Sequence, residues 1–489
     1  MADAARIATA HRAANRTSIR VLMTSGHYAP RAFPGDHSPL SMPPPRTPRL
    51  IEAAKRPLPE GTFVVGAGLA IAGITAYGFQ ILSFRSLTKA DYAALNALWV
   101  FVFVLAPGFF LSLEQEVGRA VADRRARNVG GGPVVRRAAL LGLILTVALA
   151  LATTGVALGT SIIDRLFEGN AGLVLCLVIA LFTYCFQHVT RGTLAGNGRF
   201  GPYGLILGAE GFIRIVPCIA LAAAGVDDPV WYGLCLAIPP VLGSLVSLRG
   251  QHGLVEPGPE APWSELSTNL GYLLGGSLLA QALSYAPFLG AQILSKANER
   301  DAVADFIVGL FLARIPILLF QAIQAALLPK LAHLAGEGRH EDFRAAVRKL
   351  VLVVVGIGAA GVIAGGTLGP PVGEILFGDK FQLGNIDLAL LAAGSGLFIL
   401  ALTLAQALIA LLGHARVLYA WVVGLAGFIA VTAVAGSDLF RRVEIGYVAG
   451  TAAAALVMAA MLVDRFRAGI PDDGLASLVE QIEHEPLEI

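Results

Sequence analysis

Residues 61–113 read GTFVVGAGLAIAGITAYGFQILSFRSLTKADYAALNALWVFVFVLAPGFFLSL, and this stretch decides the class of fold. Its charged residues are Arg85, Lys89 and Asp91, which lie together near its middle. A helix needs about 20 apolar residues to cross the roughly 30 Å of hydrocarbon in a bilayer. The apolar run on each side of these charges is long enough, so the stretch predicts two transmembrane helices joined by a short turn.

The rest of the chain repeats this pattern. Charged residues make up 14% and hydrophobic residues 56% of its 489 residues, whereas soluble domains carry about 25% charged residues. A soluble fold could not cover its surface with so few charges. The apolar runs therefore predict an all-α polytopic membrane protein with twelve transmembrane helices. The expected helices are 61–84, 92–113, 138–160, 171–190, 203–224, 230–248, 267–294, 303–328, 350–369, 386–412, 415–435 and 445–463.

The two ends of the chain differ from this apolar region. Residues 1–60 are basic and proline-rich, which predicts a disordered cytoplasmic tail. Residues 464–489 predict a short acidic cytoplasmic tail. Between the tails we expect an N-terminal lobe of six helices over 61–248, a cytoplasmic linker over 249–266 and a C-terminal lobe of six helices over 267–463.

The positions of the basic residues predict the orientation in the membrane. Arg and Lys resist translocation and therefore gather in cytoplasmic loops. The connections after the second and the eighth expected helices are the richest in basic residues. These residues are Arg119, Arg124, Arg125, Arg127, Arg136 and Arg137 in the first connection, and Lys330, Arg339, Arg344, Arg348 and Lys349 in the second. We therefore expect a multi-pass protein of the cell membrane with both termini in the cytoplasm.

A weak internal repeat relates the two expected lobes. An Ala-Asp-Tyr motif at 90–92 opens the second expected helix, and Ala-Asp-Phe at 304–306 opens the eighth. The connections at 194–200 and 411–417 keep nearly the same offset. Because this offset spans six helices, both copies have one orientation, which predicts lobes related by a pseudo-two-fold axis along the membrane normal. Two such lobes can enclose a central cavity and rock around it, which favours transport by alternating access.

Ionisable residues inside the expected helices mark candidate functional positions, because each costs about 2.5–3.5 kcal/mol on insertion scales. Glu210 and Arg214 lie four residues apart on one face of the fifth helix, as either a structural ion pair or part of a site. Glu210 is the only carboxylate that we expect in the middle of a span. Arg314 in the eighth helix has no acidic residue within one turn, which favours a functional role. Pro316 is expected to kink that helix and expose backbone carbonyls to the guanidinium.

Neutral polar residues extend this set. Ser277, Gln281, Ser284 and Tyr285 follow the spacing that puts them on one stripe of the seventh helix. Hydrogen bonds between helices explain such residues equally well. Taken together, they predict a polar cavity with a positive bias, which prefers an anionic head group. The candidate substrate-binding residues are Arg214, Arg314, Glu210, Gln281, Gln321, Gln80 and Tyr285, with Tyr77 beside Gln80 on the first helix.

Other chemistries lack support in the sequence. No Gly-rich loop ends in Gly-Lys-Ser/Thr, so a nucleotide-binding P-loop is not predicted. The histidines show no metal-binding spacing, and the four cysteines lie in apolar runs as small hydrophobic residues. The expected outer loops are too short to carry a catalytic domain. We therefore expect no enzyme activity, no cofactor, no metal site and no nucleic-acid partner.

Four short stretches resemble motifs of polysaccharide flippases. Residues 85–92 resemble the R-x-L-x-x-x-x-[YF] start of the second helix, and residues 191–200 look like the RG-x-L-x-G-x-x-R-F loop. Residues 312–331 are similar to the eighth helix and its end, and residues 375–381 resemble the LFG-x-x-F outer loop. Over 61–463 the chain is thus similar to the polysaccharide branch of the multidrug/oligosaccharidyl-lipid/polysaccharide (MOP) flippase superfamily.

The resemblance implies twelve helices in two lobes and a function in cell-envelope polysaccharide export. It implies that the protein flips a polyprenyl-diphosphate-linked oligosaccharide from the cytoplasmic to the outer leaflet by alternating access. Cavity arginines of the family meet the diphosphate and acidic sugars, and Arg214 and Arg314 are the positions here that could do so. The implied partners are an anionic lipid-linked glycan, membrane lipid and glycan-synthesis enzymes. Coupling to protons or sodium ions stays open, with Glu210 as the candidate carboxylate.

Two alternatives to this function remain. The first is a cation-coupled multidrug or small-molecule exporter of the same superfamily, which predicts several carboxylates in the cavity. The second is a non-transporting membrane scaffold of a glycan-synthesis complex, which would leave the two lobes without a water-accessible cavity.

Overall fold

The computed structural model describes most of the chain. The described residues are 62–266, 270–296, 299–317, 320, 331, 334, 339–378, 381–411 and 413–467. They belong to one compact unit, Leu58–Ile489. The expected tail over 1–60, most of the expected C-terminal tail and the candidate residue Gln321 lie outside the described residues. The part that is described consists of helices and connections without a strand, which confirms the all-α prediction.

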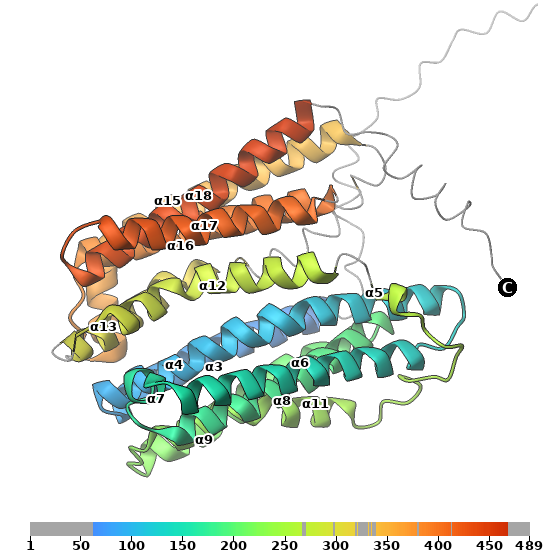
Figure 1. Cartoon of the computed structure of the whole chain (residues 1–489), viewed down its shortest axis with the longest axis horizontal. Helices are drawn as coiled ribbons and strands as arrows, with labels where there is room; N and C mark the ends of the chain where they lie inside the picture. Colours follow the sequence, from blue (N-terminus) through green and yellow to red (C-terminus); the bar gives the residue numbers. More distant parts are fainter. Residues whose placement is uncertain are drawn as a thin grey trace, which may run out of the picture. The chain divides into compact units, whose positions relative to one another are not determined.

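The N-terminal half forms a first group of helices, which we call the N-bundle. Its elements are α3 (Thr62–Ser86), α4 (Lys89–Ala106), the π-helical segment η1 (Pro107–Leu111), α5 (Ser112–Ala126), α6 (Gly132–Gly159), α7 (Ile162–Leu166), α8 (Ala171–Gly196), α9 (Phe200–Ala223), α10 (Pro229–Ala237) and α11 (Pro239–Leu248). Here α3 packs on α9, α5 and α6 pack on α8, and α11 packs on α9 (Figure 1).

The C-terminal half forms a second group, which we call the C-bundle. Its elements are α12 (Leu270–Leu294), α13 (Arg300–Ala313), α15 (His340–Phe377), α16 (Asn385–Ala410), α17 (His414–Val434) and α18 (Leu439–Arg467). The main packing pairs are α17 with α18, α15 with α16, and α16 with α18, while α12 packs on α17. A single 3-10 turn, η2 (Trp263–Glu265), lies between the two bundles in the sequence.

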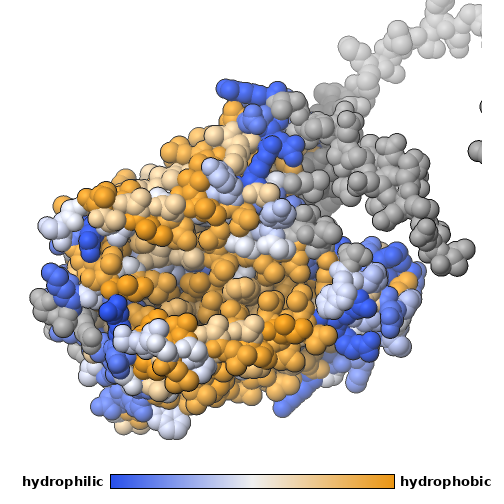
Figure 2. Space-filling view, viewed as in Figure 1, coloured by the Kyte–Doolittle hydropathy of each residue, from blue (hydrophilic) through white to orange (hydrophobic). Residues whose placement is uncertain are grey.

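Within the described residues, 11 helical segments are long and apolar enough to cross a membrane. Figure 2 shows apolar residues over the middle of the face in view and hydrophilic residues toward the ends of the helices. Each of these segments coincides with one of the expected helices. The expected eighth helix, 303–328, contains most of α13 and then continues into residues that are not described.

Two spans extend furthest beyond the helices that we expected from hydropathy. The second is one helical segment, Lys89–Ala126, and the ninth is His340–Phe377. As a result Arg119 and Arg124 lie on α5, and Arg348 lies on α15, instead of in loops. Hydropathy marks only the part of a helix that matches the hydrocarbon, whereas Glu, Arg and Ala continue a helix readily beyond it.

The connection between the bundles is packed against the N-bundle. The buried Arg124 side chain donates from Nε and Nη2 to the carboxylate of Glu265, at 2.9 Å each. It also donates to the carbonyl of Pro259 at 2.9 Å. The backbone N–H of Gly132 donates to the Glu256 carbonyl at 2.8 Å. Residues 249–266 therefore form an ordered strap along the end of α5.

The two bundles meet where α12 packs on α4 and η1, and where α13 packs on α4. We call this surface the inter-bundle contact. Ser277 Oγ donates to the Pro107 carbonyl at 3.1 Å, and Gln292 Nε2 donates to the Ala93 carbonyl at 2.7 Å. Two side chains that lie far apart on α12 thus donate hydrogen bonds to backbone carbonyls of the N-bundle.

Candidate functional site

Arg314 lies at a break in its helix. α13 ends at Ala313, and Arg314 is its C-cap residue. Pro316 follows, and proline cannot donate a backbone hydrogen bond inside a helix. Arg314 Nη1 donates to the Ser284 carbonyl at 2.7 Å, and Nη2 donates to Ser284 Oγ at 2.9 Å. The carbonyl that receives the guanidinium therefore belongs to α12, and not to the helix of Arg314 as we expected.

Aromatic rings surround the Arg314 guanidinium. Its Cζ lies 4.0 Å from the ring centroid of Tyr285 and 5.8 Å from that of Phe288. Such cation–π contacts stabilise a partly desolvated guanidinium by about 0.5–2 kcal/mol each. Among the ion pairs of the described residues, none involves Arg314. Within the part of the chain that the structure describes, no carboxylate balances the positive charge of this side chain.

Arg214, on the N-bundle side, is balanced. It forms an ion pair with Glu210 one turn earlier on α9, and both side chains are buried. Gln187 Nε2 donates to Glu210 Oε2 at 2.7 Å, and Tyr184 Oη donates to Oε1 at 3.2 Å. Glu210 is thus fully hydrogen-bonded, in agreement with the structural ion pair that the sequence left open.

A chain of aromatic rings connects the two arginines across the inter-bundle contact. Arg214 Cζ lies 5.9 Å from the ring centroid of Trp99, and Trp99 lies 5.8 Å from Phe311. Phe311 lies 5.2 Å from Phe288, which reaches Arg314. Trp99 Nε1 is buried and has no hydrogen-bond partner among the described residues. We call these five residues the aromatic bridge.

The other candidate residues differ in their surroundings. Tyr77 Oη donates to the Phe311 carbonyl at 2.9 Å, so it joins the two bundles next to the aromatic bridge. Gln80 accepts a hydrogen bond from Tyr92 at 3.0 Å and is buried inside the N-bundle. Gln281 is half-buried on α12. The structure therefore brings Tyr77, Tyr285 and Arg314 together and places Gln80 elsewhere.

A second buried cluster in the N-bundle was not expected. Glu114 on α5 lies 2.7 Å from His188 Nδ1 and 3.2 Å from Arg191, and Tyr203 donates to it at 2.8 Å. The expected second helix ended one residue before Glu114. Glu210 is therefore not the only buried carboxylate of the spanning segments, because Glu114 and Glu444 are buried in them as well. Continuing the helical pattern past residue 113 would have found Glu114.

Polar contacts close one end of the inter-bundle contact. We call it the Lys89 end, and the distribution of basic residues predicts that it faces out of the cell. Lys89 Nζ forms an ion pair with Asp305 Oδ2 at 2.9 Å. Arg85 donates to the carbonyls of Ile375 and Leu376 at 3.0 Å each, at the end of α15. These contacts join α3 and α4 to α13 and α15.

The Lys89–Asp305 pair brings together the two copies of the internal repeat. Asp91 of the first copy is held locally, because Thr88 Oγ1 accepts from its backbone N–H at 3.1 Å and donates to its carboxylate at 2.6 Å. The second copy has Ala302 in place of Thr88. Asp305 is therefore free of a local cap and pairs with Lys89 beside the first motif.

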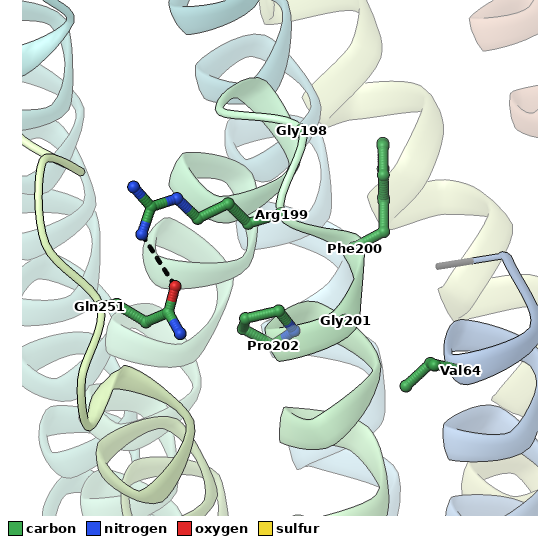
Figure 3. A pocket seen from close by; sticks show the side chains of 7 residues that line it. All are labelled: Val64, Gly198, Arg199, Phe200, Gly201, Pro202 and Gln251. Carbon is green, nitrogen blue, oxygen red and sulfur yellow. Dashed lines mark hydrogen bonds between the residues drawn. The ribbon is translucent and has the colours of Figure 1, made fainter. Parts of the chain in front are cut away.

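A shallow pocket lies at the opposite end of the N-bundle (Figure 3). It has a volume of about 480 Å³ and is lined by Val64, Gly198, Arg199, Phe200, Gly201, Pro202 and Gln251. Arg199 donates to Gln251 Oε1 at 2.8 Å and also binds the His252 carbonyl. Because Arg199 holds the strap and no candidate residue lines the pocket, we assign it no role in substrate binding.

Comparisons with known sequences give relatives without a described activity. No protein-family model matches the chain. An uncharacterized protein of Mycobacterium tuberculosis (strain ATCC 25618 / H37Rv) is 27% identical over 374 residues, which cover 72% of this chain and 80% of the relative. A second uncharacterized protein of that strain is 29% identical over 368 residues, covering 73% and 81%.

Solved structures show the fold. A MATE crystal structure in complex with MaL6 has a TM-score of 0.64 at 18% identity, covering 83% of this chain and 95% of that one. An outward-facing multidrug resistance MATE family transporter of the MOP superfamily has a TM-score of 0.61 at 20% identity, covering 84% and 96%. A mutant of the Vibrio cholerae MATE transporter VcmN has 0.63 at 15%, covering 84% and 97%.

This chain has the fold of the MATE transporters. The similarity confirms the expected architecture of a helical membrane protein.

Proposed function

We propose that the protein is a transporter of the MOP type that works by alternating access around the aromatic bridge. Three features support this proposal. The chain has the MATE fold, its two bundles meet over a surface of polar and aromatic contacts, and one end of that surface is closed by an ion pair and three hydrogen bonds that can break. Contacts of this kind separate at modest cost, since each contributes roughly 1 kcal/mol.

The cargo that we propose is an anionic amphiphile, namely a polyprenyl-diphosphate-linked oligosaccharide that moves from the cytoplasmic to the outer leaflet. The unbalanced charge of Arg314 carries this proposal. A guanidinium binds phosphate oxygens in pairs, and it does so most strongly where water is excluded. The buried N–H of Trp99 offers a further donor nearby. The polyprenyl tail would stay in the surrounding lipid.

The second candidate is a cation-coupled exporter of drugs or other small molecules. The multidrug resistance transporter among the solved neighbours and the buried carboxylates Glu114 and Glu210 favour it. Both carboxylates are paired, however: Arg214 balances Glu210, and Arg191 lies 3.2 Å from Glu114. Neither leaves a net negative charge for a cationic drug, so we rank an anionic cargo first. A scaffold without transport would have no use for the uncompensated Arg314.

Transport by the full chain in liposomes tests both candidates. The probes are a fluorescent short-chain polyprenyl diphosphate saccharide and a cationic dye, and the variants are Arg314→Gln and Arg314→Lys. We expect wild-type protein to move the saccharide, Arg314→Gln to slow it by about 10–100-fold, as for the loss of a charged hydrogen bond of about 1.5–3 kcal/mol, and Arg314→Lys to retain part of the rate. Movement of the dye alone would establish the second candidate, and movement of neither probe would refute the transporter proposal.

A further inference from the structure

Glu444 is a buried carboxylate of the C-bundle. It lies near the start of α18, at the Lys89 end, and its exposed fraction is 0%. Neither of its carboxylate oxygens has a hydrogen-bond partner among the described residues. Glu210 and Glu114, by contrast, accept hydrogen bonds from two or more groups. An ionised carboxylate that is buried without donors costs several kcal/mol.

Arg441 is the positive group that lies beside Glu444, but it donates its hydrogen bond to another carboxylate. Its Nη2 donates to Asp387 Oδ1 at 2.8 Å, whereas its Nη1 lies 3.4 Å from Glu444 Oε2 without a hydrogen bond. Asp387 also accepts from the backbone N–H of Gly384 at 3.1 Å. One guanidinium therefore stands between two carboxylates, and only Asp387 receives hydrogen bonds. The guanidinium and the two carboxylates together are neutral when one carboxylate holds a proton. Of the two, Glu444 lacks a hydrogen-bond donor that would stabilise its negative charge.

The helices packed against α18 supply no second positive charge. α12 contains no charged residue, and Asp387 is the only one on α16. On α17 the charged or titratable residues are His414, Arg416 and Tyr419, which lie in the half of the helix away from the Lys89 end. These three helices therefore add no positive group near Glu444 besides Arg441 of its own helix.

Among the described residues, Arg441 is the one positive group that forms an ion pair with Glu444, and no group donates a hydrogen bond to it. Asp438, just before α18, accepts from the Arg441 backbone N–H at 2.7 Å. α13 reaches α18 where Phe306 packs on Phe440. The charged residues of α13 are Arg300 at its first position, Asp301, and Asp305, which is paired with Lys89. Arg442 is two residues before Glu444, about 200° around the helix, and so points to its other side.

We propose that Glu444 binds a proton in this conformation and releases it to the solution at the Lys89 end when the bundles separate there. The Arg441 and Asp387 side chains are 35% and 25% exposed, so this pair lies between the solvent and Glu444. On release the carboxyl O–H bond breaks and the proton passes to water, which forms a hydronium ion. The release step rests on the proposed alternating access, whereas the occupancy in the closed conformation does not.

Infrared difference spectroscopy of the full chain in lipid bilayers tests the occupancy. Wild-type protein is compared with Glu444→Gln and with Glu374→Gln, a control that removes an exposed carboxylate at the same end of the C-bundle. We expect a protonated carboxylic acid C=O band at neutral pH that shifts in D₂O, remains in Glu374→Gln and is lost in Glu444→Gln. The glutamine variant keeps the shape of the protonated acid, so its thermal stability should match the wild type.

A spectrum without such a band at neutral pH, or a band that survives in Glu444→Gln, would overturn the proposal. A large loss of thermal stability in Glu444→Gln at neutral pH would overturn it as well, because it would show that an ionised Glu444 stabilises the fold through Arg441. Neither measurement involves transport. A failed transport assay therefore leaves this proposal intact, and a missing band leaves the proposed transport function intact.

Discussion

Charged residues inside this membrane protein fall into two kinds, which only their contacts distinguish. Arg214 and Glu210 neutralise each other and are buried together. Arg314 is held by the backbone and hydroxyl of Ser284 and by two aromatic rings, and it keeps its charge. The first arrangement is neutral by itself, whereas the second has no carboxylate partner among the described residues. We therefore expect Arg214 and Glu210 to stabilise the fold and Arg314 to bind a ligand.

Breaking the Arg214–Glu210 pair should test this distinction. We expect Arg214→Leu to lower the stability of the protein by about 3–5 kcal/mol, because it leaves Glu210 buried without its counter-charge. The double variant Arg214→Leu, Glu210→Leu should recover most of that loss. Thermal unfolding followed by fluorescence-detected size-exclusion chromatography measures both. A single variant as stable as the wild type would show that the pair does not hold the fold.

At the scale of elements, polar groups at the ends of helices join the two bundles at the Lys89 end. Lys89 opens α4, Asp305 lies in the first turns of α13, and Arg85 in the last turn of α3 binds carbonyls at the end of α15. Cations placed at a helix C-terminus also interact favourably with its dipole. The closed end thus combines these polar contacts with apolar packing, in which the ring of Phe84 lies 5.6 Å from that of Phe377.

Reversing the charge of Lys89 alone should open the Lys89 end. Exchanging the charges of Lys89 and Asp305 together should keep it closed. We expect Lys89→Asp to raise the rate at which a water-soluble maleimide labels Ala291→Cys by about fivefold, as for a loss of about 1 kcal/mol from the closed state. Ala291 is fully buried on α12 at this end. The combined change Lys89→Asp, Asp305→Lys should restore slow labelling. The experiment requires replacement of the four native cysteines by Ala, and equal labelling in all variants would contradict a role for the pair.

At the scale of the whole molecule, alternating access requires that the bundles move relative to each other. A disulfide across the inter-bundle contact should therefore stop transport, whereas one inside a bundle should not. A Cβ on Gly108 would lie 3.6 Å from Leu278 Cβ across the contact, and a Cβ on Gly427 would lie 3.6 Å from Ala453 Cβ inside the C-bundle. Both distances suit a disulfide.

We expect the oxidised pair Gly108→Cys, Leu278→Cys to lose transport and to regain it on reduction. The oxidised pair Gly427→Cys, Ala453→Cys serves as the control and should keep wild-type rates. Transport in liposomes before and after reduction measures both. Undiminished transport by the oxidised inter-bundle pair would show that the bundles do not separate at η1 during the cycle.

Most of the fold followed from the sequence, because crossing a bilayer is a local requirement. A run of apolar residues must satisfy its own backbone hydrogen bonds and therefore forms a helix wherever it lies. Arg314 and the helix break near Pro316 were predicted for the same reason, because a charge or a proline inside an apolar run is visible in the local sequence. Locality also caused the errors in helix length at α5 and α15, since hydropathy does not record how far a helix continues outside the hydrocarbon.

The pairing of distant residues was decided by the tertiary structure alone. The sequence placed an Ala-Asp motif at the start of the second helix of each lobe, but only the folded chain shows that Asp305 meets Lys89 and that Asp91 does not take part. Likewise, the sequence contains Glu444, while its burial without a donor depends on where α16 and α18 pack. Hydropathy is summed along the chain, whereas the charge balance of a buried group depends on residues that packing brings near it.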